Sequence, residues 1–284
     1  MSFLANLFGY ILNFLYNLVN NYGLAIILFC IALKLITLPI SIKQQKTMKK
    51  SAKIQEQMQE IQAKYKNDQV KMNQEMIEVY KREKMSPFSG CLSSIIQIII
   101  FLAVFYLVKS PLTFMKKVDP QIINDYQTQI SQENGGKTNA YPEIQIIEQK
   151  GAQDEKVYIN MDFLGIDLSK VPTQSLNDFR VYIIPALYVA SSFISIRLTT
   201  SMRNKNKKKE EEYDKKDSED EVNQLEAMQQ MNKTMSWFMP IMSISIAIVA
   251  PLGLALYWFI NNVMMIIERL ILNFIESKKG EQDD

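Results

Sequence analysis

Residues 22–42 read YGLAIILFCIALKLITLPISI, and they determine the class of protein to which the chain belongs. A helix needs about 20 predominantly apolar residues to cross the hydrocarbon core of a bilayer, which is roughly 30 Å thick. This stretch has the required length, and its one charged side chain, Lys34, lies well inside it. The stretch therefore predicts a membrane-spanning helix that carries a cation at depth.

The rest of the chain shows the same separation of charged from apolar sequence. Its 284 residues are 48% hydrophobic and 22% charged, which is ordinary for a soluble protein. Yet no charged side chain occurs in residues 1–33, 85–108, 181–196 or 234–267. The last stretch is too long for one span at a helical rise of about 1.5 Å per residue, and Pro251 divides it. We therefore expect an all-α polytopic membrane protein with five transmembrane helices.

The apolar and charged stretches divide the chain into ten segments. They are an interfacial amphipathic helix (1–20), span one (21–42), a cytoplasmic helical hairpin (43–86), span two (87–109), a small extracytoplasmic region (110–179), span three (180–200), a charged cytoplasmic linker (201–234), span four (235–250), span five (251–272) and a cytoplasmic tail (273–284). Asparagines recur on one face of the first helix and favour an interfacial position, with a spanning helix as the alternative. Short strands are expected at 143–148 and 157–161.

Basic residues predict the orientation of the chain. Residues 43–85 contain eleven Lys or Arg and residues 203–233 contain eight, whereas residues 110–179 contain six and residues 1–20 none. Cytoplasmic segments of membrane proteins carry an excess of Lys and Arg. The hairpin, the linker and the C-terminus are therefore expected in the cytoplasm, with the N-terminus outside.

The composition excludes several classes of function. The chain has no histidine, so a His-ligated metal site and a Ser-His-Asp mechanism are both impossible. Its two cysteines, Cys30 and Cys91, lie in separate apolar stretches and form no CxxC pair. Glycine-rich phosphate-binding motifs are lacking, and the net charge of +2 is too small to indicate nucleic-acid binding. We expect no enzyme activity, no cofactor and no bound metal.

Lys34 is unusual because it is a charged residue well inside a predicted membrane span. An unpaired cation at that depth costs about 3 kcal/mol or more. No Asp or Glu is expected within any other span to neutralise it, because Glu268 is expected near an end of the last helix, and the orientation favours the cytoplasmic end. We therefore expect a polar, water-containing cavity around Lys34. Other spans offer uncharged polar residues to line it, namely Gln97, Ser191, Ser192, Ser195, Ser243, Ser245, Asn261 and Asn262. Snorkelling of the lysine toward the headgroups is the alternative.

Four stretches resemble the YidC-type membrane protein insertases (the YidC/Oxa/Alb family). They are LKLITLPI at 33–40, the hairpin sequence at 65–81, PFSGCL at 87–92 with Gln97, and PLGLALYW at 251–258 with Asn261 or Asn262. The resemblance covers all five spans in order and leaves out 110–179 and 203–221. Family members usually have arginine at the position of Lys34, a proline at Ser93 and an amide at Ser195.

The resemblance implies a groove that is open to the cytoplasm and the lipid and closed toward the outside of a bacterial cell membrane. Lys34, Gln97, Ser195 and Trp258 are the residues expected to line it. The groove would move short polar segments of nascent membrane proteins across the membrane and release their helices into lipid. A Sec-type channel and the ribosome are the further partners that the family suggests, and no small-molecule substrate is expected.

Two other functions remain open from the residues alone. A small-anion carrier could use Lys34 as its binding site, although carriers usually contain paired repeats with broken helices. A structural subunit of a membrane assembly would explain the spans and the hairpin, but it gives no reason for Lys34. Stoichiometric uptake of an anion would indicate the carrier, and a silent Lys34→Ala substitution would indicate the structural subunit.

Overall fold

The computed structural model describes residues 2–65, 68–84, 89–136, 139–207 and 247–280. Over these residues the chain is helical apart from connecting segments and one short β-hairpin. Four stretches are long and apolar enough to cross a membrane, namely Ser2–Val19, Tyr22–Gln44, Phe179–Leu198 and Leu252–Leu272. The expected all-α polytopic class is confirmed. The expected span four, 235–250, lies outside the described residues except for its last few positions.

Helix α1 (Ser2–Val19) packs against the first half of the next helix, α2 (Tyr22–Lys64). Asn21 caps α2, because its side chain accepts a hydrogen bond from the Leu24 N–H at 3.0 Å. The rings of Phe8 and Phe29 meet edge to face at 5.7 Å between centroids. The opposite face of α1 exposes apolar side chains, among them Phe3 and Phe14. Both an interfacial and a spanning position are compatible with such a face.

Helix α2 is continuous from span one into the hairpin, so the two expected segments share one helix. Its 43 residues extend about 65 Å at the usual rise, which is twice the thickness of a bilayer core. The helix passes through Pro39, and Thr37 donates its hydroxyl to the Leu33 carbonyl at 2.9 Å in the preceding turn. One end of α2 must therefore project from the membrane.

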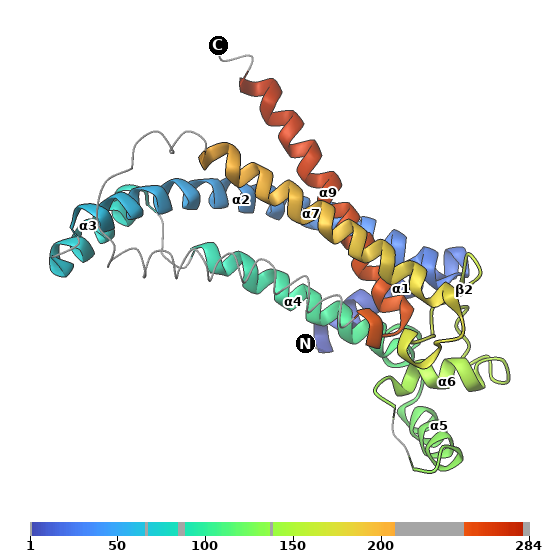
Figure 1. Ribbon diagram of the computed structural model, residues 1–284. Helices are drawn as coiled ribbons and strands as arrows, with labels where there is room; N and C mark the ends of the chain where they lie inside the picture. Colours follow the sequence, from blue (N-terminus) through green and yellow to red (C-terminus); the bar gives the residue numbers. More distant parts are fainter. Residues whose placement is uncertain (1, 66–67, 85–88, 137–138, 208–246, 281–284) are drawn as a thin grey trace.

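Helix α3 (Gln69–Arg82) folds back along the projecting end of α2 (Figure 1). Asp68 caps it by accepting from the Lys71 N–H at 2.9 Å. The two helices bury Ile54 and Val79, which belong to the apolar stripes visible in the sequence. We call this helical pair, residues 43–84, the hairpin.

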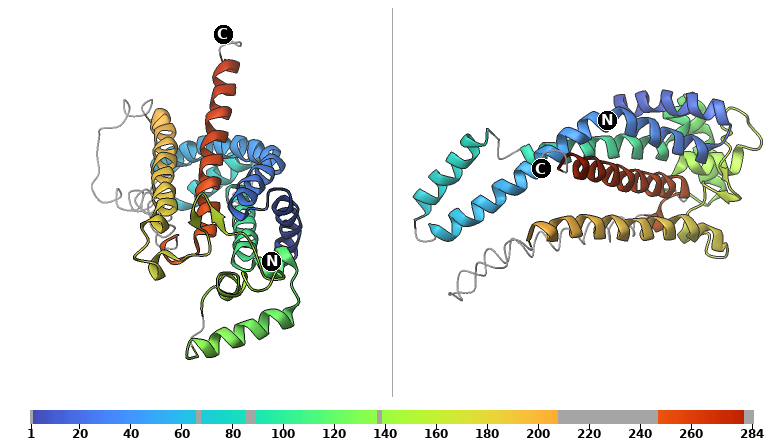
Figure 2. Two further views of the ribbon diagram at one scale, coloured as in Figure 1. Left: turned by 90° about the vertical axis from the view of Figure 1, so that its right-hand side faces the viewer. Right: turned by 90° about the horizontal axis from the view of Figure 1, so that it is seen from above.

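The described residues of the membrane part include three more long helices, α4 (Ser89–Lys109), α7 (Ile183–Lys207) and α9 (Leu252–Gly280). Helix α9 packs against both α2 and α7, and α1 packs against α4 (Figure 2). Buried side chains from these helices and from residues 110–182 form a single apolar core.

Residues 110–182, here called the cap, sit at the end of the molecule opposite the hairpin (Figure 1). Their elements are the π-helical segment η1 (Leu112–Lys116), α5 (Pro120–Glu133), α6 (Pro142–Lys150), β1 (Asp162–Phe163), β2 (Ile166–Asp167) and the 3₁₀ turns η2 (Pro172–Gln174) and η3 (Phe179–Tyr182). Strands β1 and β2 are antiparallel. Helix α1 lies so close to η1 that a Cβ atom on Gly9 would be 1.9 Å from the Phe114 carbonyl oxygen.

The expected strand at 143–148 is wrong, because this segment forms α6. Pro142 occupies the first turn, where its fixed φ favours a helix and its missing N–H costs nothing. The segment 157–161 buries alternate residues as a strand would, but it contains no strand. The short β-hairpin begins just after it.

Candidate functional site

The cap fixes the starting points of the two helices that carry the candidate site. The Tyr22 N–H at the start of α2 donates to the Asn160 carbonyl at 3.0 Å. At the start of α9, the N–H groups of Leu252 and Gly253 donate to the Lys170 and Leu168 carbonyls, both at 2.9 Å. First-turn N–H groups have no partner within their own helix. These bonds therefore satisfy helix ends and hold α2 and α9 beside each other.

A carboxylate inside the cap strengthens this connection. Glu143 of α6 is buried and accepts hydrogen bonds from the Thr113 N–H at 3.0 Å and the Thr113 hydroxyl at 2.6 Å. It thus ties α6 to the first turn of η1, where anions are favoured. Burial away from water raises the pKa of Glu143, and the hydrogen bonds from Thr113 offset part of that rise.

Helices α2 and α9 bring Lys34 and Glu268 into direct contact. The Lys34 ammonium forms an ion pair with Glu268 Oε2, and the two side chains are 20% and 12% exposed. Glu268 lies within the stretch of α9 that is long and apolar enough to cross a membrane. The expectation that no acidic residue of another span would neutralise Lys34 is therefore wrong. The sequence does not show how the helices pack. Packing decides whether a carboxylate near the end of one span can reach a cation that lies deeper in another.

A cavity of about 50 Å³ adjoins this ion pair between α2, α4 and α9. We call it the Lys34 cavity. Its lining residues are Cys30, Leu33, Lys34, Thr37, Ile40, Ser41 and Gln44 of α2, Ile100 of α4, and Tyr257, Asn261 and Met265 of α9. A polar cavity of this size has room for a few water molecules, since about 15 Å³ is enough for one.

The polar residues of the cavity follow one face of α2. Lys34, Thr37, Ser41 and Gln44 are three, four and three residues apart, a spacing that places them on one side of a helix. The stripe leads from Lys34 toward the hairpin. The sequence signal for this stripe is the helical repeat of polar residues at 34, 37, 41 and 44.

Two of the other expected groove residues, Trp258 and Ser195, do not line the Lys34 cavity. Trp258 is buried behind the cavity, where it stacks on Phe101 and lies against Tyr188, with 6.1 Å between centroids in each pair. Its indole N–H has no hydrogen-bond partner among the described residues. Ser195 is half-buried on α7, and its carbonyl oxygen accepts from Arg269 of α9 at 3.5 Å. The side chain of Gln97 lies outside the described part of the chain.

Two serines that the sequence offered as cavity lining instead join α7 to α9. The amide of Asn262 donates to the Ser192 hydroxyl at 2.8 Å and to the Ser191 hydroxyl at 3.3 Å. All three residues are buried. Hydrogen bonds of this type commonly hold membrane helices together. Asn262 therefore serves packing, while the adjacent Asn261 faces the cavity.

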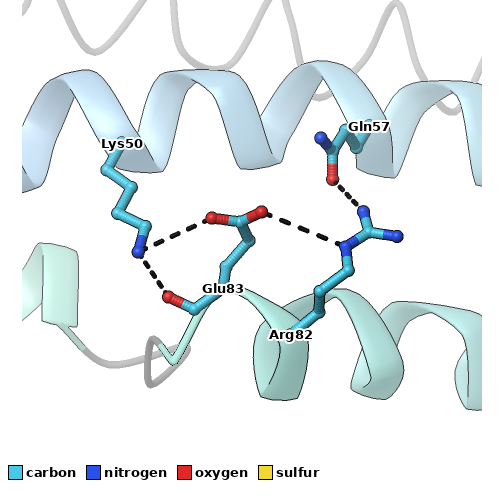
Figure 3. Close-up of polar contacts among 4 residues, drawn as sticks. All are labelled: Lys50, Gln57, Arg82 and Glu83. Atoms are coloured by element: carbon cyan, nitrogen blue, oxygen red, sulfur yellow. Dashed lines mark hydrogen bonds and ion pairs between the residues drawn. The ribbon is translucent and has the colours of Figure 1, made fainter.

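The hairpin presents a second set of polar contacts, which Figure 3 shows. Lys50 of α2 pairs with the Glu83 carboxylate at 3.5 Å and also donates to the Glu83 carbonyl. Arg82 donates to the side-chain oxygen of Gln57 at 2.8 Å. These contacts hold α3 against the projecting part of α2.

Comparisons with known proteins agree with this architecture. The model of the family described as 60Kd inner membrane protein matches residues 14–279. The membrane protein insertase YidC of Syntrophus aciditrophicus is 45% identical over 94 residues, which are 33% of this chain and 17% of that protein. The protein of the same name from Zymomonas mobilis is 39% identical over 104 residues, which are 37% of this chain and 18% of that protein.

The insertase YidC of Chlorobaculum parvum is 42% identical over 100 residues, which are 35% of this chain and 17% of that protein. The matched part of the chain thus covers less than a fifth of the length of these relatives. The resemblance seen in the sequence motifs is confirmed, and the apolar helices fit a multi-pass bacterial membrane protein. The chain therefore belongs to the 60Kd inner membrane protein family and is similar to the proteins named membrane protein insertase YidC.

Proposed function

We propose that the chain is a membrane protein insertase that moves short polar segments of nascent membrane proteins across the bilayer. The observation that carries the proposal is the Lys34 cavity, a polar space inside the span region that is connected by a polar stripe on α2 to the hairpin. Membership of the family and the names of the matched relatives support the same role.

The proposed activity depends on reducing the thickness of hydrocarbon that a polar segment must cross without water. Polar segments lose their water when they enter hydrocarbon, and every unsatisfied polar group then costs several kcal/mol. A wet cavity that reaches part of the way across reduces the thickness that such a segment must cross without water. Lys34 adds an attraction for acidic side chains, which is stronger at the reduced dielectric of the cavity. The apolar helix of the substrate can then leave toward the lipid.

The hairpin is the proposed first contact for an incoming substrate. Its methionines, including Met58 and Met72, are partly accessible, and flexible thioether side chains adapt to many apolar sequences. The excess of Lys and Arg in the hairpin supports a cytoplasmic position, with the cap and the N-terminus outside. The lipid bilayer and nascent membrane proteins are the proposed partners. A Sec-type channel and the ribosome are further candidates that the family suggests.

The test uses the purified full chain in liposomes and a single-span substrate with a short acidic tail. Protection of the tail from external protease measures insertion. Wild type, Lys34→Arg, Lys34→Ala and Lys34→Glu are compared at equal reconstitution levels. We expect wild type and Lys34→Arg to insert the substrate and the other two variants to lose most of the activity.

Other outcomes would contradict parts of this proposal. If Lys34→Ala inserts as well as wild type, the polarity of the cavity matters and its charge does not. If wild type protects no more substrate than empty liposomes, autonomous insertion is refuted. Uptake of a small anion by the same liposomes would support a carrier instead.

A further inference from the structure

Glu268 is a charged residue of the candidate site that the proposed function does not use. It places a negative charge beside Lys34 within a membrane span. A groove that only had to attract acidic segments would gain nothing from such a residue. Glu268 would compete for the cation, because it is already held beside Lys34 by the packing of α9 against α2.

The surroundings of Glu268 show that Lys34 is its main partner. Glu268 Oε2 pairs with Lys34, whereas Oε1 is buried and has no hydrogen-bond partner among the described residues. The neighbouring Arg269 points toward α7, where it donates to the Ser195 carbonyl at 3.5 Å. The carboxylate is thus only partly satisfied. Removal of Lys34 from it would leave a negative charge at depth without its counter-ion.

Lys34 and Glu268 together give the site little net charge. Two opposite charges in contact largely cancel for a third charge that approaches from farther away. An acidic segment would then have to separate the pair before it could gain the full attraction of Lys34. Discrimination between substrates depends on such unfavourable exchanges as well as on favourable contacts.

We propose that Glu268 is a specificity-determining residue that neutralises Lys34 and so limits the preference of the site for acidic segments. This inference rests on the proposed function, since it concerns the substrates of the same site. It assigns to the chain a substrate class that includes neutral polar segments and is not restricted to acidic ones.

The test measures the ratio of insertion of an acidic-tailed substrate to that of an otherwise identical neutral-tailed one. Wild type is compared in liposomes with Glu268→Gln, Lys34→Gln and the double variant Lys34→Gln/Glu268→Gln. We expect the ratio to fall in the order Glu268→Gln, wild type, double variant, Lys34→Gln. The ratio for Glu268→Gln should exceed that of wild type by about fivefold or more, an effect of the size expected for one partly buried charge pair.

Asp125→Asn is the matched control, because it removes one carboxylate from an exposed position on α5, outside the hairpin and the Lys34 cavity, and changes the net charge equally. Its ratio should equal that of wild type. Equal ratios for wild type and Glu268→Gln would overturn the inference, and so would a fall in the ratio on Glu268→Gln substitution.

If Glu268→Gln does not fold, a comparison of the double variant with wild type tests the same inference. The double variant leaves no unpaired charge, and its ratio should lie within about threefold of wild type, since neutral sites discriminate weakly. A larger difference would mean that Glu268 does not neutralise Lys34 in the working protein. Insertion of the neutral-tailed substrate above empty liposomes tests the proposed function separately, so the two ideas can fail independently.

Discussion

Among the described side chains of helix α2, Lys34 and Lys50 each pair with a glutamate, in very different surroundings. Lys34 pairs with Glu268 of α9 in the span region, where the side chains are 20% and 12% exposed. Lys50 pairs with Glu83 at the end of α3, where the side chains are 45% and 32% exposed. In the hairpin, water can solvate each charge alone, so the pair contributes little. In the span region, neither charge has an adequate alternative, so the pair is required if both residues are to remain charged.

The comparison shows that lysine–glutamate ion pairs have different effects at different positions along one helix. Lys50 and Glu83 help to align α3 on α2, as do Arg82 and Gln57 beside them (Figure 3). Lys34 and Glu268 set the charge of a cavity. The following predictions test this difference, beginning with the largest expected effect.

Reversal of the deep lysine should be the most damaging change. Lys34→Glu would place two carboxylates together in the span region, and we expect a loss of about 3 kcal/mol in stability. The exchange variant Lys34→Glu/Glu268→Lys should recover most of that loss. Thermal unfolding in detergent micelles, followed by tryptophan fluorescence, measures both effects.

Lys43→Glu is the control for this prediction, since Lys43 is exposed on the same helix and its reversal should change stability by only about 0.5 kcal/mol. Failure of the exchange variant to recover stability would show that the ion pair is not what holds the two residues in place.

Loss of the buried carboxylate in the cap should come next. Glu143→Ala would leave the N–H and hydroxyl of Thr113 without their partner, and we expect a loss of about 2 kcal/mol. Asp125→Ala on an exposed face of α5 serves as the control. The same thermal measurement applies, and equal melting temperatures for both variants would refute a structural role for Glu143.

The pH dependence of stability offers a finer test of the buried carboxylate of Glu143. The pKa of Glu143 is raised from its ordinary value of 4.5, so the folded state retains the proton more strongly than the unfolded state does. The stabilisation from this group is therefore complete below pH 4.5 and is lost as the pH rises through the folded-state pKa. Wild type should lose this increment over that range, whereas Glu143→Gln should not. An identical pH profile for both proteins would contradict the prediction.

The hairpin pair should have the smallest effect. Lys50→Ala is expected to cost less than about 1 kcal/mol, because both partners are well exposed to water. The difference from wild type should shrink further in high salt, which screens exposed charges. Hydrogen exchange of the α3 amides, measured at low and high salt, reports this local effect. An effect as large as that of Lys34→Glu would erase the distinction between the two pairs.

Much of the fold could be predicted from the sequence because it depends on local composition. The apolar stretch 181–196, for example, contains no charge and predicts a membrane helix, and α7 contains residues 183–196 of it. Ile54 and Val79 belong to apolar residues that recur at helical spacing in the segment expected as a helical hairpin, and both are buried. The segment 143–148 was misjudged because its isoleucines fit both a strand and a helix, and Pro142 decided in favour of the helix.

Part of the candidate site could likewise be predicted from local sequence, and part of it depends on helix packing. That Lys34 would lie within an apolar helix follows from residues 22–42 alone, since hydropathy acts on each segment separately. The partnership with Glu268 does not follow from any local pattern. It arises because bonds from the cap set the starting points of α2 and α9, and the packing of these helices then determines which side chains meet. Hydropathy is a property of a segment, whereas an ion pair between distant helices is a property of their packing.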